Sequence, residues 1–126
     1  MSDIRANKIS NESGNGPINL TGQSAAKAWC NFSSLSTTSN PDMNGVRDSL
    51  NVSSIVSLAV GIDETNYSND FANFNYAATV GSTAGGTLHF SSGIYTASTL
   101  RLTAKGSSGN NSDASINTFM AHGDLA

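Results

Sequence analysis

Residues 50–62 have the sequence Leu-Asn-Val-Ser-Ser-Ile-Val-Ser-Leu-Ala-Val-Gly-Ile, in which a large apolar residue stands at every even position except Ser54. Successive side chains of a β-strand point to opposite faces, so a period of two buries one face and leaves the other in water. The stretch therefore predicts β-structure whose even-numbered apolar residues face the core.

The same alternation continues along the rest of the chain. Turn-forming residues separate the alternating runs at residues 82–86, 91–93 and 106–113. Residues 24–29 fit either a short helix or the start of a strand, and we prefer the strand. The spacing predicts an all-β fold, a small antiparallel β-sandwich or barrel-like knob. The alternating residues outside 50–62 are Phe74, Tyr76, Ala78, Val80, Leu100, Leu102, Ala104, Ile116, Thr118 and Met120.

Large apolar residues are sparse before residue 45. Asn15-Gly16-Pro17 is a strong break, and residues 33–44 form a polar connection that contains Pro41. We therefore predict an extended N-terminal arm over residues 1–44, used for attachment or subunit exchange, and an antiparallel β domain over residues 45–126. Small inward residues give this domain a thin core, so we expect assembly with identical copies, with a monomeric sandwich as the alternative.

Composition argues against several classes of protein. Charged residues make up 12% of the chain, the net charge is −3, and the six basic residues are scattered, so a nucleic-acid-binding patch is missing. No apolar run approaches the roughly 20 residues that cross a bilayer. The first residues lack the apolar stretch of a signal peptide, so we expect no export by that route. The single cysteine, Cys30, allows no internal disulfide and is expected to be a buried thiol.

No catalytic or metal-binding pattern stands out. The many serines include no Gly-x-Ser-x-Gly motif, His89 and His122 are far apart, and the acids lack the spacing of a calcium loop. We predict no enzymatic activity, no cofactor and no metal. Tyr95, after a Ser-Ser-Gly turn, is the best candidate for surface recognition, with packing as its alternative. Asn110 and Asn111, in the loop over residues 106–113, are further candidates.

Two motifs carry a resemblance to a known family. Residues 26–32 read Ala-Lys-Ala-Trp-Cys-Asn-Phe, and residues 48–55 read Asp-Ser-Leu-Asn-Val-Ser-Ser-Ile. With their flanking residues they resemble tail-fibre-like minor structural proteins of bacteriophages, especially marine ones. The chain departs from that pattern at residues 56–61, which are apolar where the family turns with a loop rich in Gly, Asn and Asp. This departure leaves the hairpin boundary near residues 56–62 open and suggests a subunit contact there.

The resemblance implies a non-enzymatic virion component, a fibre, knob or capsid-decorating protein. It implies a homotrimer assembled in the bacterial cytoplasm, with an N-terminal part docked to other capsid or tail proteins and a β domain that faces outward. The alternative is a tail-fibre module that binds a host receptor or cell-surface glycan through loops 81–87, 91–95 and 106–113. A small glycan hydrolase ranks last, because no carboxylate constellation is visible. The candidate virion or subunit contacts are Ile9, Ile18, Leu20, Trp29, Phe32 and Leu58.

Overall fold

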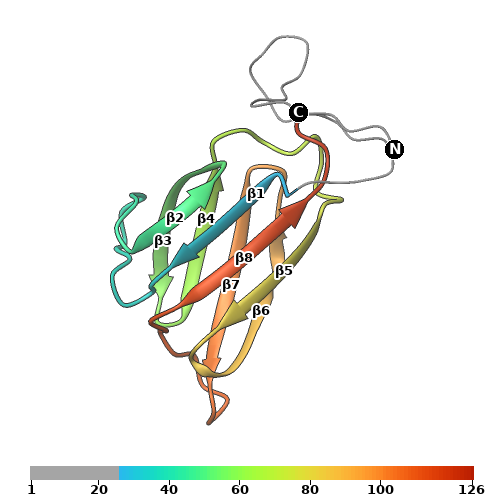
Figure 1. Ribbon diagram of the computed structural model, residues 1–126. Coiled ribbons are helices and arrows are strands. Elements are labelled where there is room, and N and C mark those ends of the chain that lie inside the picture. The colour runs from blue at the N-terminus through green and yellow to red at the C-terminus, as the bar shows by residue number, and fades with distance from the viewer. Residues whose placement is uncertain (1–25) are drawn as a thin grey trace, which may run out of the picture.

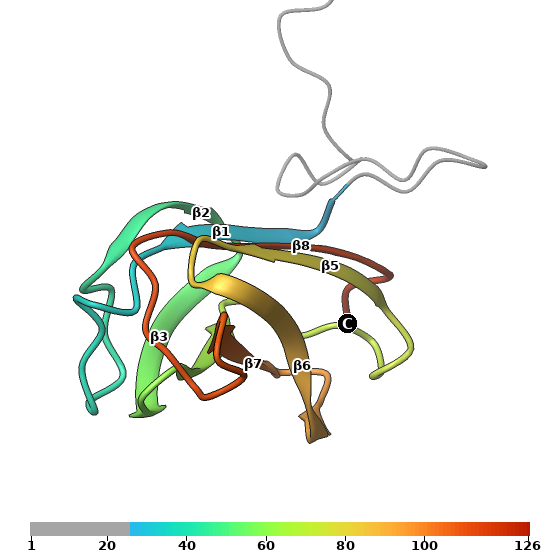
Figure 2. The same cartoon turned by 90° about the horizontal axis from the view of Figure 1, so that it is seen from below.

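Two four-stranded antiparallel sheets face each other in a computed structural model of the chain (Figures 1 and 2). The structure describes residues 26–126, and residues 86–94 are described by their backbone alone. The described residues contain strands and no helix, which confirms the predicted all-β, antiparallel fold. Each sheet buries one face against the other, so the fold is a β-sandwich.

Three pairs of strands that are neighbours in sequence also pair within one sheet, and the chain crosses between the two sheets at the other four connections. The first sheet has the order β2-β1-β8-β5, and its strands are β2 (Val46–Leu50), β1 (Ala28–Phe32), β8 (Asn117–His122) and β5 (Ala77–Ser82). The second sheet has the order β3-β4-β7-β6, and its strands are β3 (Val52–Ala59), β4 (Ile62–Tyr67), β7 (Thr99–Gly106) and β6 (Gly85–Tyr95).

β1 lies inside the first sheet and corrects the predicted domain boundary. It pairs with β2 on one side and with β8 on the other, and its residues Ala28, Cys30 and Phe32 are buried. A boundary at residue 44 would separate β1 from strands that complete its hydrogen bonding. The β domain therefore begins before residue 45, and the preference for a strand after residue 24 is confirmed for β1. The rest of the predicted arm, residues 1–25, lies outside the described residues.

A single residue carries the chain from the first sheet to the second. Asn51 lies between β2 and β3 with φ 58°, a left-handed conformation that Asn accepts more readily than most residues. Its side chain fixes the corner, because Oδ1 accepts from the Asn69 N–H at 2.7 Å and Nδ2 donates to the Asn69 carbonyl at 2.9 Å. The residues after the corner belong to the second sheet. Leu50, before the corner, is therefore exposed, whereas Val52, after it, is buried.

The even-numbered apolar residues of the run over residues 50–62 do not all face the core, which corrects the first prediction. Val52 and Val56 are buried as expected, but Leu58 and Val60 are 45% and 60% exposed. The hairpin turn falls within the run at Gly61, whose φ is 66°. A Cβ there would lie 2.6 Å from the Ala104 carbonyl oxygen, so only glycine fits. β3 therefore ends at Ala59 and β4 begins at Ile62, which settles the open hairpin boundary.

The other predicted turns are partly right. β5 ends at Ser82 and β6 begins at Gly85, and the loop between β7 and β8 covers residues 107–116, as the breakers at 82–86 and 106–113 predict. The predicted turn at residues 91–93 is wrong, because these residues lie within β6. The ladder between β6 and β7 is irregular there, between Phe90 and Tyr95. The three small residues interrupt pairing without reversing the chain.

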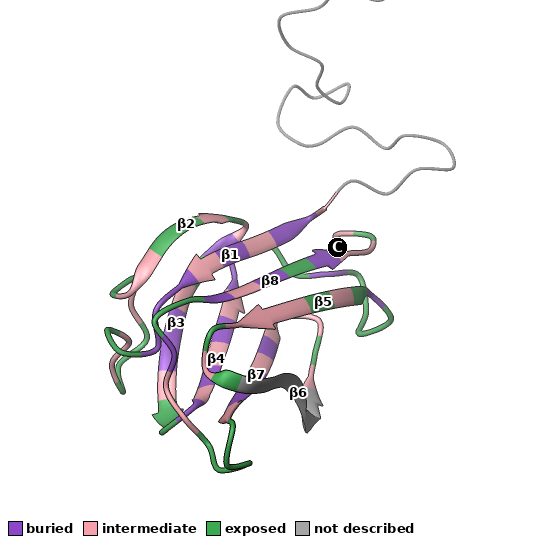
Figure 3. Ribbon diagram, turned by 60° about the horizontal axis from the view of Figure 1, so that its bottom comes forward, coloured by how far each residue is buried: buried purple, intermediate pink, exposed green. Residues whose placement is uncertain are grey.

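The interior has two chemically different ends, and Figure 3 shows buried residues alternating along the strands that enclose them. The aromatic end is built around the rings of Tyr67, Phe71, Tyr76 and Phe119. The polar end is built around the carboxylate of Asp63, with Ser34, Thr37 and Asn117. Ile55, Leu100 and Leu102 are buried apolar residues of the same core.

Candidate functional site

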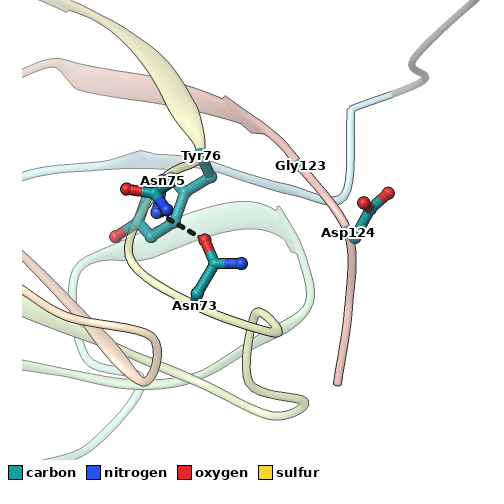
Figure 4. Close-up of a pocket in the computed structure, with 5 residues that line it drawn as sticks. All are labelled: Asn73, Asn75, Tyr76, Gly123 and Asp124. Carbon is teal, nitrogen blue, oxygen red and sulfur yellow. Dashed lines mark hydrogen bonds between the residues drawn. The ribbon is translucent and has the colours of Figure 1, made fainter.

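A polar pocket of about 250 Å³ opens on the surface at the aromatic end (Figure 4). The loop between β4 and β5 supplies Asn73, Asn75 and Tyr76, and the segment after β8 supplies Gly123 and Asp124. Figure 4 shows the two carboxamide side chains together near the Tyr76 ring, with Asp124 apart on the C-terminal segment. The pocket therefore offers neutral amide donors and acceptors on one side and a carboxylate on the other.

Backbone contacts hold the two walls of this pocket together. The Ala72 N–H donates to the Asp124 carbonyl at 2.8 Å, and the Ala126 N–H donates to the Asp70 carbonyl at 2.9 Å. Gly123 permits the close approach, because a Cβ there would lie 2.6 Å from Cβ of Tyr76. The last residues thus pair with the β4–β5 loop, and the pocket has a defined shape.

The side chains at the mouth of the pocket differ in how firmly they are held. Asn73 Oδ1 accepts from the Asn75 N–H at 2.7 Å, which fixes the Asn73 carboxamide in a local turn. Asn73, Asn75 and Asp124 are exposed. Hydrogen bonding to a polar ligand is the chemistry that such groups support. The lining residues include no nucleophile with an adjacent base, which a covalent mechanism would need.

Tyr76 offers the pocket the edge of its ring and not a face on which a ligand could stack. Its ring lies between Phe71, with ring centroids 4.1 Å apart, and Tyr95, with ring centroids 4.3 Å apart, and both pairs are nearly parallel. The Tyr76 hydroxyl donates to the Thr99 carbonyl and accepts from the Tyr67 hydroxyl, each at 3.2 Å. Burial raises the pKa of Tyr76 to about 12. Because both ring faces are covered, Tyr76 orders the core and offers no flat platform to a ligand.

The structure separates the predicted surface-recognition residues. Tyr95 is half-buried at the end of β6, stacked on Tyr76, and its hydroxyl donates to the Tyr76 carbonyl. Asn110 and Asn111 are exposed in the loop after β7. Tyr95 pairs with Leu100 near the start of β7, so the length of that strand, about 20 Å, separates it from the asparagines. The three residues do not form one site, and the packing alternative for Tyr95 is the one observed.

The structure places the predicted virion or subunit contacts in different environments. Phe32 is 0% exposed in the core, so its prediction as a virion or subunit contact is wrong, since no partner reaches it in the folded domain. Trp29 is half-buried on the outer face of β1, and Leu58 is exposed near the end of β3. Ile9, Ile18 and Leu20 lie outside the described residues. Cys30 is buried as expected, and burial raises the pKa of its thiol to about 12.

An exposed apolar row, which the sequence pattern did not reveal, crosses the outer face of the first sheet. Leu50, Trp29, Met120 and Thr79 stand opposite one another on β2, β1, β8 and β5, and we call this set the outer row. Leu50 is 46% and Met120 is 44% exposed. The alternation of Leu50 and Met120 assigned them to the core. Their outward position follows from strand pairing, which the local pattern does not contain.

The polar end holds a carboxylate inside the sandwich. Asp63 is 2% exposed and accepts from Ser34 Oγ at 2.6 Å and from Thr37 Oγ1 at 3.0 Å. Asn117 Nδ2 donates to Ser34 Oγ, so the network joins β4, β8 and the loop between β1 and β2. Burial is the main reason that the pKa of Asp63 is raised, and the charge of Asp113 adds to it. The network is enclosed, and its visible role is to anchor the loop.

Two other kinds of feature are absent from the described residues. Within residues 26–126, His, Cys, Asp and Glu side chains do not gather in groups of three or more that could hold a metal ion. In the same part of the chain, no helix is long and apolar enough to span a membrane.

No family model, no curated protein and no solved structure matches the chain.

Proposed function

We propose that the chain is a non-enzymatic structural module of a bacteriophage particle, a fibre, knob or capsid-decorating protein that assembles through the outer face of its first sheet. The resemblance of residues 26–32 and 48–55 to tail-fibre-like structural proteins supports the virion role. In the structure these motifs form β1 and much of β2 and β3, so the resemblance covers strands of the sandwich itself.

The outer row is the single observation that carries the proposal. Its Leu50, Trp29 and Met120 are large apolar residues at adjacent cross-strand positions, and two of them are more than 40% exposed. Scattered apolar residues are normal on a surface, whereas a contiguous apolar patch is typical of a surface that another protein covers. A sheet face with such a row is suited to packing against a neighbouring subunit in an assembly.

The experiment compares two methionines of equal exposure. Met120, in the outer row, and Met43, in the loop between β1 and β2, are 44% and 42% exposed. A lysine at position 120 introduces a charge that packing would desolvate, so we expect Met120→Lys to lower incorporation into particles by about tenfold or more. Met43→Lys should be incorporated normally. The amount of chain in purified particles is measured by immunoblot, and absence of the wild-type chain from the particles would refute the proposal.

The attachment role of residues 1–25 requires a deletion that spares β1. Removing residues 1–25 leaves Ala28–Phe32 and the whole sandwich intact, whereas a deletion to residue 30 would remove three of the five residues of a central strand. We expect the shortened chain to keep the β-sheet circular dichroism spectrum and to be lost from particles. Normal incorporation of this variant would show that the attachment surface lies within residues 26–126.

A second candidate function is binding of a host-surface glycan, and the polar pocket favours it. The carboxamide of Asn75 and the carboxylate of Asp124 are exposed at its mouth, and both groups hydrogen-bond hydroxyls well. Asn75→Ala and Asp124→Ala should each abolish glycan binding in saturation-transfer NMR, whereas Asn40→Ala, at an exposed site in another loop, should not. Equal binding by all four proteins, wild type included, would exclude the pocket.

A further inference from the structure

The four edge strands of the sandwich are not equally protected against pairing with another chain. β2 carries the exposed charges of Arg47 and Asp48, and its pairing with β1 is irregular beside Phe32. β6 pairs irregularly with β7 at two places. Charges and bulges are devices that keep an edge strand from adding a further strand. Both of these edges therefore carry such a device.

The edge of β3 is covered by the chain's own backbone. The Ser57 N–H donates to the Thr38 carbonyl at 2.7 Å, and Asp42 and Ile55 exchange hydrogen bonds of 2.7 and 3.2 Å. The covering segment also contains Pro41, which has no N–H to offer. β3 is therefore closed along the part of its edge that these residues occupy.

Within residues 26–126, β5 has none of these protections. All six of its residues pair with β8 in continuous register, from Ala77 opposite His122 to Ser82 opposite Asn117. It has no charged residue and no proline. Among the described residues no strand is paired with its other edge, which lies at the border of the first sheet in Figure 1. Alternate residues of a strand direct both backbone groups to one side, so half of the β5 residues direct their backbone groups to this edge, where no described strand pairs with them.

We propose that β5 is a self-association edge, which pairs antiparallel with β5 of a second copy and joins the two first sheets into one. The occupant is a second copy because the strand is uncharged and small-sided, so pairing with itself meets no like-charge repulsion. Such pairing does not depend on a role in a phage particle, so the purified chain alone is enough to test it. The homotrimer that the resemblance implies is the competing outcome.

The faces of the strand restrict how two copies pair. Thr79 and Gly81 stand opposite Met120 and Thr118 on the outer face, and Val80 stands opposite buried Phe119 on the inner face. In one continuous sheet, outward residues must stand opposite outward residues. Odd-numbered residues of β5 therefore pair with odd-numbered residues of the second copy. Centring the two-fold axis on Thr79 places Thr79 opposite Thr79 of the second copy and runs the outer row unbroken through both subunits.

A cysteine at position 79 tests this register directly. Directly opposite residues of an antiparallel pair have Cα atoms about 4.5–5.5 Å apart, within the range of about 4.4–6.8 Å that a disulfide spans. We expect Thr79→Cys to form a covalent dimer under mild oxidation. Met120→Cys is the matched control, because it exposes a thiol on the same face but on a central strand. The native Cys30 is buried and does not compete.

Light scattering of the unmodified chain completes the experiment. We expect a mass of two chains for the wild type, a mass of one chain for Thr79→Lys, which places two ammonium groups opposite each other, and two chains for Ala59→Lys in the second sheet. A wild-type mass of one or three chains, a dimer that Thr79→Lys leaves intact, or equal cross-linking of the two cysteine variants would overturn the proposal.

Discussion

The aromatic end and the polar end fill the same sandwich by different means. At the aromatic end, Tyr67 meets Phe71, Tyr76 and Phe119 edge to face, with ring centroids 5.0, 5.9 and 6.4 Å apart. At the polar end, the buried group is the carboxylate of Asp63, which accepts hydrogen bonds from two hydroxyls. Tyr67 and Asp63 belong to the same strand and the same face of β4, four residues apart. One face of one strand therefore changes from aromatic packing to hydrogen bonding along its length.

The difference shows how a chain with few large aliphatic residues closes a core. Rings bury a large area each, so a few of them fill the end where the C-terminal segment and the β4–β5 loop meet. At the other end, the loop between β1 and β2 is held against the sandwich, and its hydrogen bonds to a buried acceptor fix its orientation. The aromatic end should therefore dominate stability, and the polar end should be sensitive to pH.

The largest expected effect is at the aromatic end. Phe71 is 1% exposed, so Phe71→Ala removes a buried ring and should lower the free energy of unfolding by about 3–5 kcal/mol. Phe74 is 63% exposed in the same loop, so Phe74→Ala should change it by less than about 0.5 kcal/mol. Urea unfolding followed by circular dichroism measures both. Equal effects of the two substitutions would mean that the ring cluster does not hold the fold.

The second effect is at the polar end. Asp63→Ala leaves the Ser34 hydroxyl without its acceptor and the Thr37 hydroxyl with only the Ser34 carbonyl, so we expect unfolding to become easier by about 1–3 kcal/mol, typical for a buried donor that loses its partner. Asp42→Ala is the control, because Asp42 is a surface carboxyl of the adjoining loop. A smaller loss for Asp63→Ala than for Asp42→Ala, in the same urea assay, would contradict the anchoring role.

The pH dependence of stability has a definite sign at Asp63. Burial raises the pKa of this carboxyl above its ordinary value of 3.8, so the folded state holds the proton more tightly than the unfolded state. The stability that Asp63 contributes is full below that ordinary value and is lost as pH rises through the raised pKa. We expect the difference in unfolding free energy, wild type minus Asp63→Asn, to fall from pH 4 to pH 7. A difference that rises over this range would reverse the assignment.

The third effect is at the corner that joins the two sheets. Asn51→Ala removes the three hydrogen bonds between its side chain and Asn69 and places alanine at φ 58°, so we expect a loss of about 1–2 kcal/mol. Asn51→Gly removes the same bonds but relieves the backbone, and should cost less. Differential scanning calorimetry ranks the two variants. If glycine were the worse of the two, the left-handed backbone would not be what selects asparagine here.

Local periodicity was enough to predict the fold class and several of the strands, because alternation is a property of neighbouring residues. The change of face at Asn51 and the turn at Gly61 were not predictable, since an apolar run looks the same whether it continues or reverses. The place of β1 in the first sheet also escaped prediction, because its partners β2 and β8 are set by pairing over long separations.

The candidate site was less predictable than the fold. The polar pocket joins residues 73–76 to residues 123–124, and no short motif links segments so far apart. The outer row likewise depends on register between strands. The buried Asp63 follows directly after Ile62, so alternation alone favoured the apolar residue for the core. Ser34 and Thr37, which make its burial possible, lie almost thirty residues earlier in the chain.

The smallest expected effect lies midway between the two ends. Thr65 stands between Asp63 and Tyr67 on the inner face of β4, is 0% exposed, and its Oγ1 has no hydrogen-bond partner among the described residues. A buried hydroxyl without a partner destabilises a protein, so Thr65→Val should raise the free energy of unfolding by about 1 kcal/mol. Thr37→Val should lower it, because the Thr37 hydroxyl donates to Asp63. The same threonine-to-valine substitution is thus expected to lower the free energy of unfolding at Thr37 and to raise it at Thr65. Loss of stability in both variants, measured by urea unfolding, would show that the hydrogen-bonded network extends through Thr65 toward the rings.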